Sequence, residues 1–247
     1  MEEKGVATLD RALAILAAFT DDMPCLSLAE ISRRTGLYKS TLLRLLASFQ
    51  QAGLIEQNDD GDYFVGVMAA RLANLHQHAM RGSNLIMTAM QKLVAATSES
   101  ANFYVRRNDV RVCIYCVDSP RRVRANMLLG DIFPLERGAA GKILSAFSPD
   151  IETNPELDEI RDSYFALSRG EYTEELMGLS VPVLGLSNRV EGAIALTGPI
   201  SRFPAEKIAS AKVELLKTAI DLTRSFGGDL KGLELALRRA EQALTDA

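Results

Sequence analysis

The side chains in this sequence that are best suited to contact a polyanion lie in one short stretch, RRTGLYKSTLLRLLASF, at residues 33–49. An arginine can hold the edge of a guanine through two hydrogen bonds, and lysine and hydroxyl groups can bind phosphate oxygens. The candidate DNA contacts are Arg33, Arg34, Tyr38, Lys39, Ser40, Thr41 and Arg44. The alternative is an ordinary amphipathic helix whose basic face is only solvated, as most basic helix faces are.

The residues around this stretch predict two helices joined by a tight turn. Ser27 followed by Glu30 forms a capping box at the start of the first helix, and Gly36 suits a turn that needs a positive φ. A second helix begins near Lys39, and its apolar residues recur at positions i, i+3, i+4 and i+7 as one buried stripe. The stripe consists of Leu42, Leu45, Leu46 and Phe49. The basic and hydroxyl side chains are left on the open face of that helix.

Two further elements complete a winged helix-turn-helix pattern. A helix is expected over residues 8–20, with Thr8 as its N-cap. Two short extended runs flank Asp60-Gly61, which is a strong signal for a two-residue hairpin turn. Three helices followed by a hairpin form the layout in which the third helix enters the major groove of DNA. The first domain is therefore expected over residues 1–66.

The composition is that of a globular chain without a basic footprint over its whole surface. Of the 247 residues, 47% are hydrophobic and 24% are charged, and the net charge is −4. DNA binding would have to rest on a local patch, because phosphates respond to charge within a Debye length of about 8 Å. No apolar run reaches the ~18 residues of a membrane span. The acidic N-terminus has no signal-peptide pattern, so we expect a cytoplasmic protein.

Residue types that could support catalysis or metal binding are few, with three cysteines and two histidines. Cys113 and Cys116 have CxxC spacing within a run that is typical of a strand. Positions i and i+3 of a strand point to opposite faces, which favours core packing over a redox or zinc pair. His76 and His78 lie two residues apart on an expected helix and do not share a face. We therefore expect no enzyme, no catalytic residues, no metal and no cofactor.

The rest of the chain predicts a linker helix over residues 67–82, a second domain over 83–228 and an extra helix over 229–247. Extended runs in the second domain occur at 101–107, 110–118, 123–129, 176–185 and 190–198. Helices are expected at about 84–97, from about 138, at 155–166 and at 205–226. This alternation favours a mixed sheet flanked by helices, the build of a small-molecule sensory domain, and an α+β fold class. The extra helix is expected to expose Leu230, Leu233, Leu237 and Leu244, either for packing on the domain or for assembly.

Over roughly residues 8–226, this chain resembles the IclR family of bacterial transcriptional regulators. The matching stretches of the first domain are RALAIL, LSLAEISRRTGLYKSTLLRLLASFQQAGLI and DGDYFVG. Those of the second are FPLERGAAGKILSAF, SRGEYTEE, GLSVPVLG and AIALTGPISRF. The resemblance implies a winged-helix DNA-binding domain, a GAF-like effector-binding domain, and dimers that often pair into tetramers. One departure is Tyr38, which stands where the family commonly has a proline just before the recognition helix.

The resemblance also implies an effector pocket walled by the loop PLERGAAGKIL, by two strands and by the stretch that carries Glu171. The loop lacks the GxxxxGK[ST] spacing of a phosphate loop, and Ile143 stands at the hydroxyl position. It does end at a helix start, which favours an anion such as a carboxylate. The expected pocket residues are Met127, Leu129, Gly130, Phe133, Leu135, Ala139, Ala140, Gly141, Ser168, Glu171, Gly178, Ala195 and Thr197.

This expected pocket differs from that of family members that bind small oxo-acids. Those members often carry Asp, Cys and two Ser at the positions of Ser168, Gly178, Ala195 and Thr197. Fewer polar anchors and more apolar wall suit an aromatic or extended carboxylate. The alternative is that these residues are sheet core without a physiological ligand.

Together these patterns predict a sequence-specific DNA-binding regulator whose operator binding is modulated by a small-molecule effector. A homodimer, or a dimer of dimers, would place recognition helices in successive major grooves of a palindromic operator. The ligand would act by favouring one spacing of the DNA-binding domains over another. The alternatives are a DNA-binding repressor without a ligand and, more remotely, an enzyme that uses the second domain.

Overall fold

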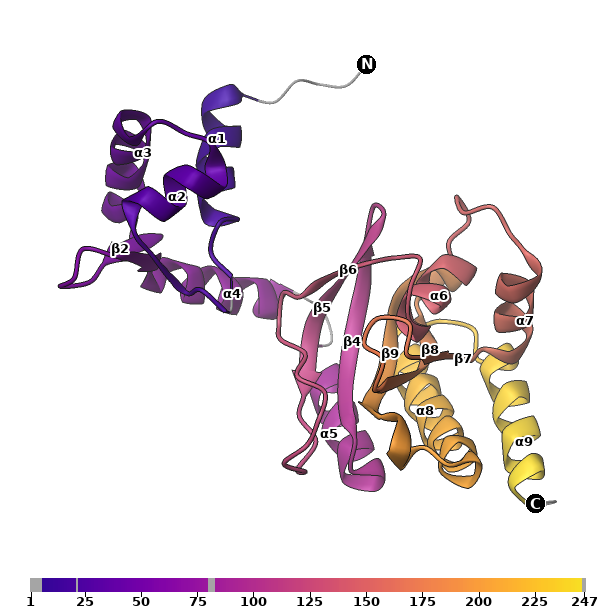
Figure 1. Ribbon diagram of the computed structural model, residues 1–247. Helices are drawn as coiled ribbons and strands as arrows, with labels where there is room; N and C mark the ends of the chain where they lie inside the picture. The colour runs from indigo at the N-terminus through magenta and orange to yellow at the C-terminus, as the bar shows by residue number, and fades with distance from the viewer. Residues whose placement is uncertain (1–5, 21, 80–82, 246–247) are drawn as a thin grey trace. The chain divides into compact units, whose positions relative to one another are not determined.

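The computed structural model describes residues 6–20, 22–79 and 83–245, and it divides into two compact units, Met1–Arg81 and Gly82–Ala247 (Figure 1). Each unit has a hydrophobic core of its own. The expected linker helix is α4 (Val67–Ala79) and is grouped with the first unit, while residues 80–82 lie outside the described residues. Across the described part of the chain, no helix is long and apolar enough to cross a membrane.

The first unit is a winged helix-turn-helix domain, as predicted. Its helices are α1 (Ala7–Leu16), α2 (Leu28–Thr35), α3 (Lys39–Gln51) and α4. Its strands are β1 (Cys25–Leu26), β2 (Ile55–Gln57) and β3 (Tyr63–Val65), which form an antiparallel sheet in the order β1-β3-β2. The sequence patterns did not reveal β1, which adds a third strand to the wing.

The predicted apolar stripe of α3 packs into this domain's hydrophobic core. Leu42 and Leu46 are fully buried, and Leu45 and Phe49 pack at the margin of the same cluster. Burying one leucine side chain contributes about 1.5–3 kcal/mol, so the stripe fixes which face of α3 turns inward. The opposite face, which carries the basic and hydroxyl groups, remains open.

The turn between α2 and α3 follows the sequence prediction closely. The Ser27 hydroxyl accepts a hydrogen bond from the Glu30 backbone N–H at 3.2 Å, which caps α2. Gly36 ends α2 with φ +70°, a left-handed conformation that glycine adopts without strain. Only half of the capping box forms, because the Glu30 carboxylate binds Arg33 and Arg34 instead.

The first helix and the hairpin turn differ from expectation. Val6 rather than Thr8 is the N-cap of α1, and the helix ends at Leu16 rather than at residue 20. The hairpin pairs Gln57 with Tyr63, and the Asn58 backbone N–H donates to the Asp62 carbonyl at 2.9 Å. The turn therefore has three residues, 59–61, rather than two. Only the glycine of the Asp60-Gly61 pair has a positive φ, whereas a two-residue turn of the expected type needs two.

The second unit is built on one six-stranded sheet. Its strands are β4 (Ser100–Arg107), β5 (Val110–Val117), β6 (Ile132–Pro134), β7 (Ala166–Arg169), β8 (Leu176–Leu184) and β9 (Val190–Pro199). They lie in the order β6-β5-β4-β9-β8-β7. Every neighbouring pair is antiparallel, where a mixed sheet was expected. The α+β class of the chain is confirmed.

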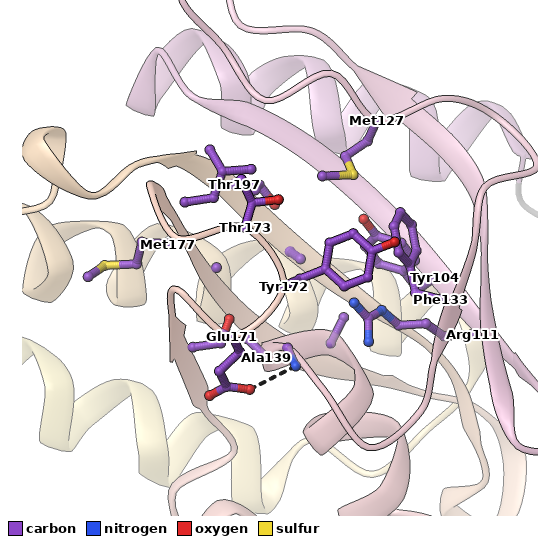
Figure 2. A pocket seen from close by; sticks show the side chains of 16 residues that line it. Tyr104, Arg111, Met127, Phe133, Ala139, Glu171, Tyr172, Thr173, Met177 and Thr197 are labelled. Carbon is purple, nitrogen blue, oxygen red and sulfur yellow. Dashed lines mark hydrogen bonds between the residues drawn. The ribbon is translucent and has the colours of Figure 1, made fainter. Parts of the chain in front are cut away.

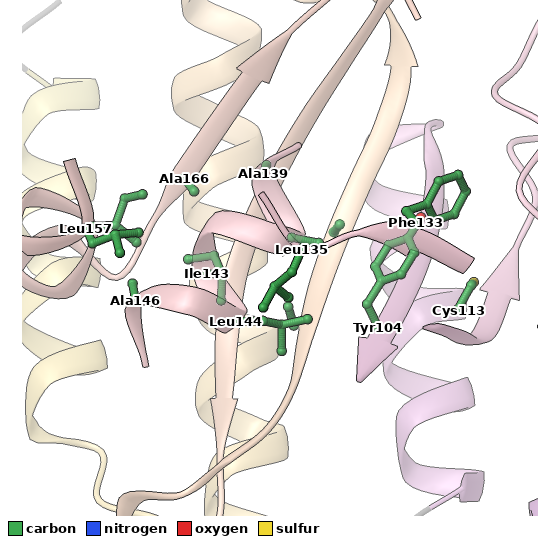
Figure 3. Packing of buried hydrophobic residues seen from close by; sticks show 14 residues of the cluster. Tyr104, Cys113, Phe133, Leu135, Ala139, Ile143, Leu144, Ala146, Leu157 and Ala166 are labelled. Atoms are coloured by element: carbon green, nitrogen blue, oxygen red, sulfur yellow. The ribbon is translucent and has the colours of Figure 1, made fainter. Parts of the chain in front are cut away.

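Helices cover both faces of this sheet. They are α5 (Ser83–Thr97), α6 (Ala139–Ala146), α7 (Pro155–Ser163), α8 (Ala205–Phe226) and α9 (Lys231–Thr245). The helices α5 and α8 pack against each other and on the sheet. The short helix α6 packs on the other side, where Ile143 and Leu144 join Ala193 and Ala195 of β9 in one buried cluster (Figure 3).

Two further predictions for this unit are wrong. Residues 123–129 form no strand, and the next strand along the chain is β6. Leu233 is fully buried rather than exposed, because α9 packs on α8 through Leu233, Ala236 and Ala240. The extra helix is thus part of the second unit.

Candidate functional site

The open face of α3 presents most of the candidate DNA contacts to solvent. Lys39, Ser40 and Arg44 are exposed, and Thr41 is half-buried. Tyr38 is the N-cap of α3, makes no side-chain capping bond and is 84% exposed. The first N–H groups of this helix are therefore not capped by that side chain, and such groups bind anions such as phosphate readily.

The two arginines of α2 differ in their availability. The Arg34 guanidinium donates to the Ala18 carbonyl at 2.7 Å, to Glu30 at 2.9 Å and to the Met23 sulfur at 2.7 Å, which joins α2 to the segment that follows α1. Arg33 shares the Glu30 carboxylate, but its side chain is 72% exposed. These two guanidinium groups lower the pKa of Glu30 to about 2. Arg33 is thus the better placed of the two to reach DNA, and Arg34 holds the domain together.

The second unit contains a cavity between α6 and the sheet (Figure 2). The volume within which the centre of a water molecule can lie is about 60 Å³. One water needs about 10–15 Å³ on this measure, so the cavity has room for several. Nine expected pocket residues line it: Met127, Phe133, Ala139, Ala140, Ser168, Glu171, Gly178, Ala195 and Thr197. The wall also includes Tyr104, Arg111, Gly138, Tyr172, Thr173, Leu176 and Met177.

The other four expected pocket residues do not line this cavity. Leu135 is buried in the core beneath α6. Gly141 lies against the Leu135 carbonyl oxygen, which a Cβ at that position would overlap. Leu129 and Gly130 lie in the turn before β6, where Leu129 is half exposed and the Gly130 N–H donates to the Cys113 carbonyl at 2.7 Å.

A buried arginine gives the cavity its chemical character. Arg111 is only 6% exposed, and its Nη1 donates to the carbonyl oxygens of Pro134, at 2.8 Å, and Arg137. Its guanidinium lies 5.4 Å from the ring centroid of Tyr104 and 5.1 Å from that of Phe133. Its Nε is buried without a hydrogen-bond partner. No carboxylate of the described residues forms an ion pair with it, and burial lowers its pKa.

The start of α6 is already occupied by a carboxylate of the chain itself. Glu171 accepts hydrogen bonds from the Gly138 N–H at 2.9 Å, drawn as a dashed line in Figure 2, and from Lys142 Nζ at 2.6 Å. Lys142 also pairs with Glu156 at 2.8 Å. The helix start expected to receive an effector anion is therefore neutralised by Glu171, which leaves Arg111 as the cation of the cavity without a counter-ion among the described residues.

An aromatic side chain stands at the mouth of the cavity. Tyr172, which is 55% exposed, meets the Phe133 ring edge to face with a centroid distance of 4.9 Å. Figure 2 shows its ring beside the side chains of Arg111 and Phe133. Three aromatic rings, those of Tyr104, Phe133 and Tyr172, thus surround one guanidinium. This arrangement suits a flat, partly apolar anion.

Comparison with known proteins assigns each of the two units to a known domain family. A family model for the IclR helix-turn-helix domain matches residues 8–59, and a model for the bacterial transcriptional regulator IclR C-terminal domain matches residues 75–155 and 152–224. The chain belongs to the IclR family. Like other members it is a DNA-binding transcriptional regulator, and its relatives are named as regulators, in agreement with the expectation that it is not an enzyme.

Individual IclR relatives match nearly the whole chain. The glycerol operon regulatory protein of Streptomyces coelicolor is 26% identical, over 92% of this chain and 97% of its own. The crystal structure of an IclR regulator from Alicyclobacillus acidocaldarius superposes with a TM-score of 0.77 at 21% identity, covering 91% of this chain and 100% of that one. An IclR homologue from Microbacterium hydrocarbonoxydans, solved with 4-hydroxybenzoate, gives a TM-score of 0.70 at 18% identity, covering 94% and 100%. These neighbours share the fold.

The sequence patterns of this IclR-family chain left Arg111, Tyr104 and Tyr172 unnoticed. A usable signal was present for Arg111, because Arg111 and Cys113 are two residues apart on one strand and therefore point to the same, buried face. A charged residue on a buried face needs an explanation. Tyr172 follows directly after Glu171 in a stretch already assigned to the pocket. Tyr104 gave no separate signal, since a buried tyrosine in a strand is ordinary.

Proposed function

We propose that this IclR-family regulator changes its affinity for DNA when a compact aromatic carboxylate binds in the cavity of the second unit. The single observation that carries the proposal is the buried guanidinium of Arg111, which has an unpartnered Nε and no carboxylate partner among the described residues. A buried charge without a counter-ion is costly, and an incoming carboxylate would remove that cost. Arginine also binds carboxylates through two parallel hydrogen bonds.

The aromatic part of the proposed ligand follows from the walls of the cavity. Tyr104, Phe133 and Tyr172 provide ring faces and edges, and Met127 adds an apolar side chain. Ser168, Thr173 and Thr197 provide hydroxyl groups for a ring substituent. The similar IclR homologue solved with 4-hydroxybenzoate supports this class of ligand. Because the cavity is small, a benzoate ring enters only when Tyr172 moves from the mouth.

The DNA-binding part of the proposal places α3 in the major groove. Lys39, Ser40, Thr41 and Arg44 would face base edges and phosphates, and Arg33 and Tyr38 would contact the backbone beside them. A homodimer would read a palindromic operator with two such helices. The ligand must bind one arrangement of the dimer better than the other, because only differential affinity shifts an equilibrium.

Calorimetry on the full-length protein tests the ligand class. We expect benzoate and 4-hydroxybenzoate to bind, and benzamide, a neutral molecule of the same shape, to bind at least tenfold more weakly. Hydrogen bonds to a charged group are worth about 1.5–3 kcal/mol, so Arg111→Met should weaken benzoate binding about ten- to hundredfold. Equal binding of benzoate and benzamide would contradict the role of Arg111, and binding of glyoxylate alone would contradict the aromatic class.

A fluorescence anisotropy titration with operator DNA, identified by footprinting the purified protein on genomic fragments, tests the coupling. Benzoate at a concentration that saturates the wild-type protein but leaves Arg111→Met largely empty should change the operator Kd of the wild-type protein only. If benzoate binds but the operator Kd does not move, the chain is a DNA-binding regulator without this effector.

A further inference from the structure

The strand β5 carries a β-bulge at Ile114. In its pairing with β4, Tyr104 lies opposite Cys113, but Phe103 lies opposite Tyr115. The single step from Phe103 to Tyr104 on β4 therefore lies opposite two steps on β5, and Ile114 is the extra residue. A bulge of this kind breaks the simple alternation of side chains along a strand.

The bulge brings Cys113 and Cys116 to the same face of the sheet. Residues directly opposite each other in an antiparallel pair point to the same side. Cys113 is opposite Tyr104 and Cys116 is opposite Asn102, and these two partners are two residues apart on a regular part of β4. The sequence argument that a CxxC in a strand splits its cysteines between opposite faces therefore does not apply to this strand.

The two thiols lie on one face of the sheet and differ in exposure. Cys113 is fully buried beside Tyr104 and Phe133 (Figure 3), and its sulfur lies 3.4 Å from the Tyr115 carbonyl oxygen. Cys116 is half-buried and packs at the margin of the same cluster. One sulfur is thus partly accessible, and the other is buried on the same face of the sheet.

The surroundings favour ionisation of the accessible thiol. The hydrogen bond from Cys113, helped by one from the Leu129 backbone N–H, lowers the pKa of Cys116 to about 7, although burial and the nearby Asp118 and Asp131 oppose this effect. The same pairing, together with burial, raises the pKa of Cys113. Of the two thiols, Cys116 is therefore the one that ionises more readily.

We propose that Cys113 and Cys116 form an oxidation site that reacts with hydroperoxides and closes to an intramolecular disulfide. The Cys116 sulfur attacks the outer oxygen of the hydroperoxide, the O–O bond breaks, and the alkoxide leaves with a proton as the alcohol. Cys116 is then a sulfenic acid. The Cys113 sulfur attacks the Cys116 sulfur, the S–S bond forms, the S–O bond breaks, and hydroxide leaves as water with the Cys113 proton. Two thiols lose two electrons and the hydroperoxide gains them.

The site is independent of the proposed effector. Neither cysteine lines the cavity, although Tyr104, which does, is the cross-strand partner of Cys113. The third cysteine, Cys25, is exposed on β1 of the other unit and supplies an internal comparison.

Mass spectrometry of the full-length, reduced protein after treatment with tert-butyl hydroperoxide tests the proposal. Both cysteines fall in one tryptic peptide, 112–121, so the disulfide appears as the loss of two hydrogen masses from that peptide. We expect the wild-type chain to drop from three titratable thiols to one, with Cys25 remaining, and dithiothreitol to restore all three. If peptide 112–121 stays reduced at a peroxide concentration that oxidises Cys25, the proposal is wrong.

Two variants separate the roles of the thiols. In Cys113→Ala, the reaction should stop at a sulfenic acid on Cys116, which dimedone traps. In Cys116→Ala, the buried Cys113 should stay unmodified. Oxidation of Cys113 in Cys116→Ala at the wild-type rate would overturn the assignment of Cys116 as the attacking group. Circular dichroism checks that each variant is folded, and the wild-type peptide map decides the proposal without them.

Discussion

Replacing Gly138 with alanine should destabilise the second unit in two ways, by straining the backbone at residue 138 and by displacing the side chain of Arg111. Gly138 has φ +78° and ψ 153°, a region that is open essentially to glycine alone. A Cβ at this position would also lie 2.9 Å from Nη2 of Arg111. The guanidinium has little room to move away, because Nη1 is bonded to the carbonyl oxygens of Pro134 and Arg137.

The two effects can be given magnitudes. Strain at a glycine-only conformation costs about 1–3 kcal/mol, and forcing an extra methyl group into a packed site costs about another 1–3 kcal/mol. Gly138→Ala should therefore destabilise the second unit by about 2–6 kcal/mol. For a domain of this size each kcal/mol lowers Tm by about 2–4 °C, which gives a fall of roughly 4–24 °C.

Gly130→Ala is the matched control. Gly130 has φ +93°, but a Cβ there would have no neighbouring atom within 4 Å. This variant should show the strain alone, about 1–3 kcal/mol. Scanning calorimetry of the full-length protein measures both variants, with hydrogen exchange of the strands identifying the transition of the second unit.

A double-mutant cycle isolates the contact with the guanidinium. In an Arg111→Ala background the overlap disappears, so Gly138→Ala should cost no more than Gly130→Ala costs in the wild-type chain. An unchanged penalty in that background, or equal penalties for the two glycine variants in the wild-type chain, would refute the argument that Gly138 makes room for Arg111.

Three further predictions concern the DNA-binding unit and the thiols. Arg44→Ala should lower discrimination at one operator base pair by about 1–3 kcal/mol in competition titrations, whereas an equal loss on all sequences would limit Arg44 to phosphate contact. Arg34→Ala should lower the Tm of the first unit, and Arg33→Ala should instead weaken DNA binding with little change in Tm. The reverse pattern would contradict the structural role given to the bonds of Arg34 with Ala18 and Met23. The rate at which iodoacetamide alkylates Cys116 should fall as pH drops through about 7, because only the thiolate reacts; a midpoint near the ordinary value of about 8.5 would show that Cys113 does not stabilise the thiolate.

The parts of the fold that the sequence predicted are those set by local rules. The stripe of Leu42 and Leu46 and the turn at Gly36 each depend on residues close together in the chain, and both are found as expected. The predictions failed where distant residues decide. Leu233 was expected to be exposed, yet it is fully buried, because α9 packs on α8.

The candidate site was predictable only in part, for a related reason. Ser168, Gly178, Ala195 and Thr197 were located through stretches that resemble the family, and all four line the cavity. Arg111 joins them through the pairing of β5 with β4 and β6, which no short motif records. The relation between Cys113 and Cys116 was misjudged because a period of two holds only in a regular strand, and the bulge opposite the step from Phe103 to Tyr104 shifts the phase.

The uncompensated charge of Arg111 also indicates how ligand binding could be linked to a change of state. A ligand that only fills the cavity interacts equally with any conformation that keeps the cavity, and so it shifts no equilibrium. An anion interacts most strongly in conformations that hold the guanidinium between Tyr104 and Phe133, because there the charge is buried and the screening is weakest. It therefore favours those conformations over any in which Arg111 reaches solvent. Gly138 lies against Arg111, and its backbone N–H donates to Glu171. The position of the Arg111 guanidinium is therefore linked to the position of the start of α6. Under the proposed function, the effector must then supply a negative charge more than a particular ring shape.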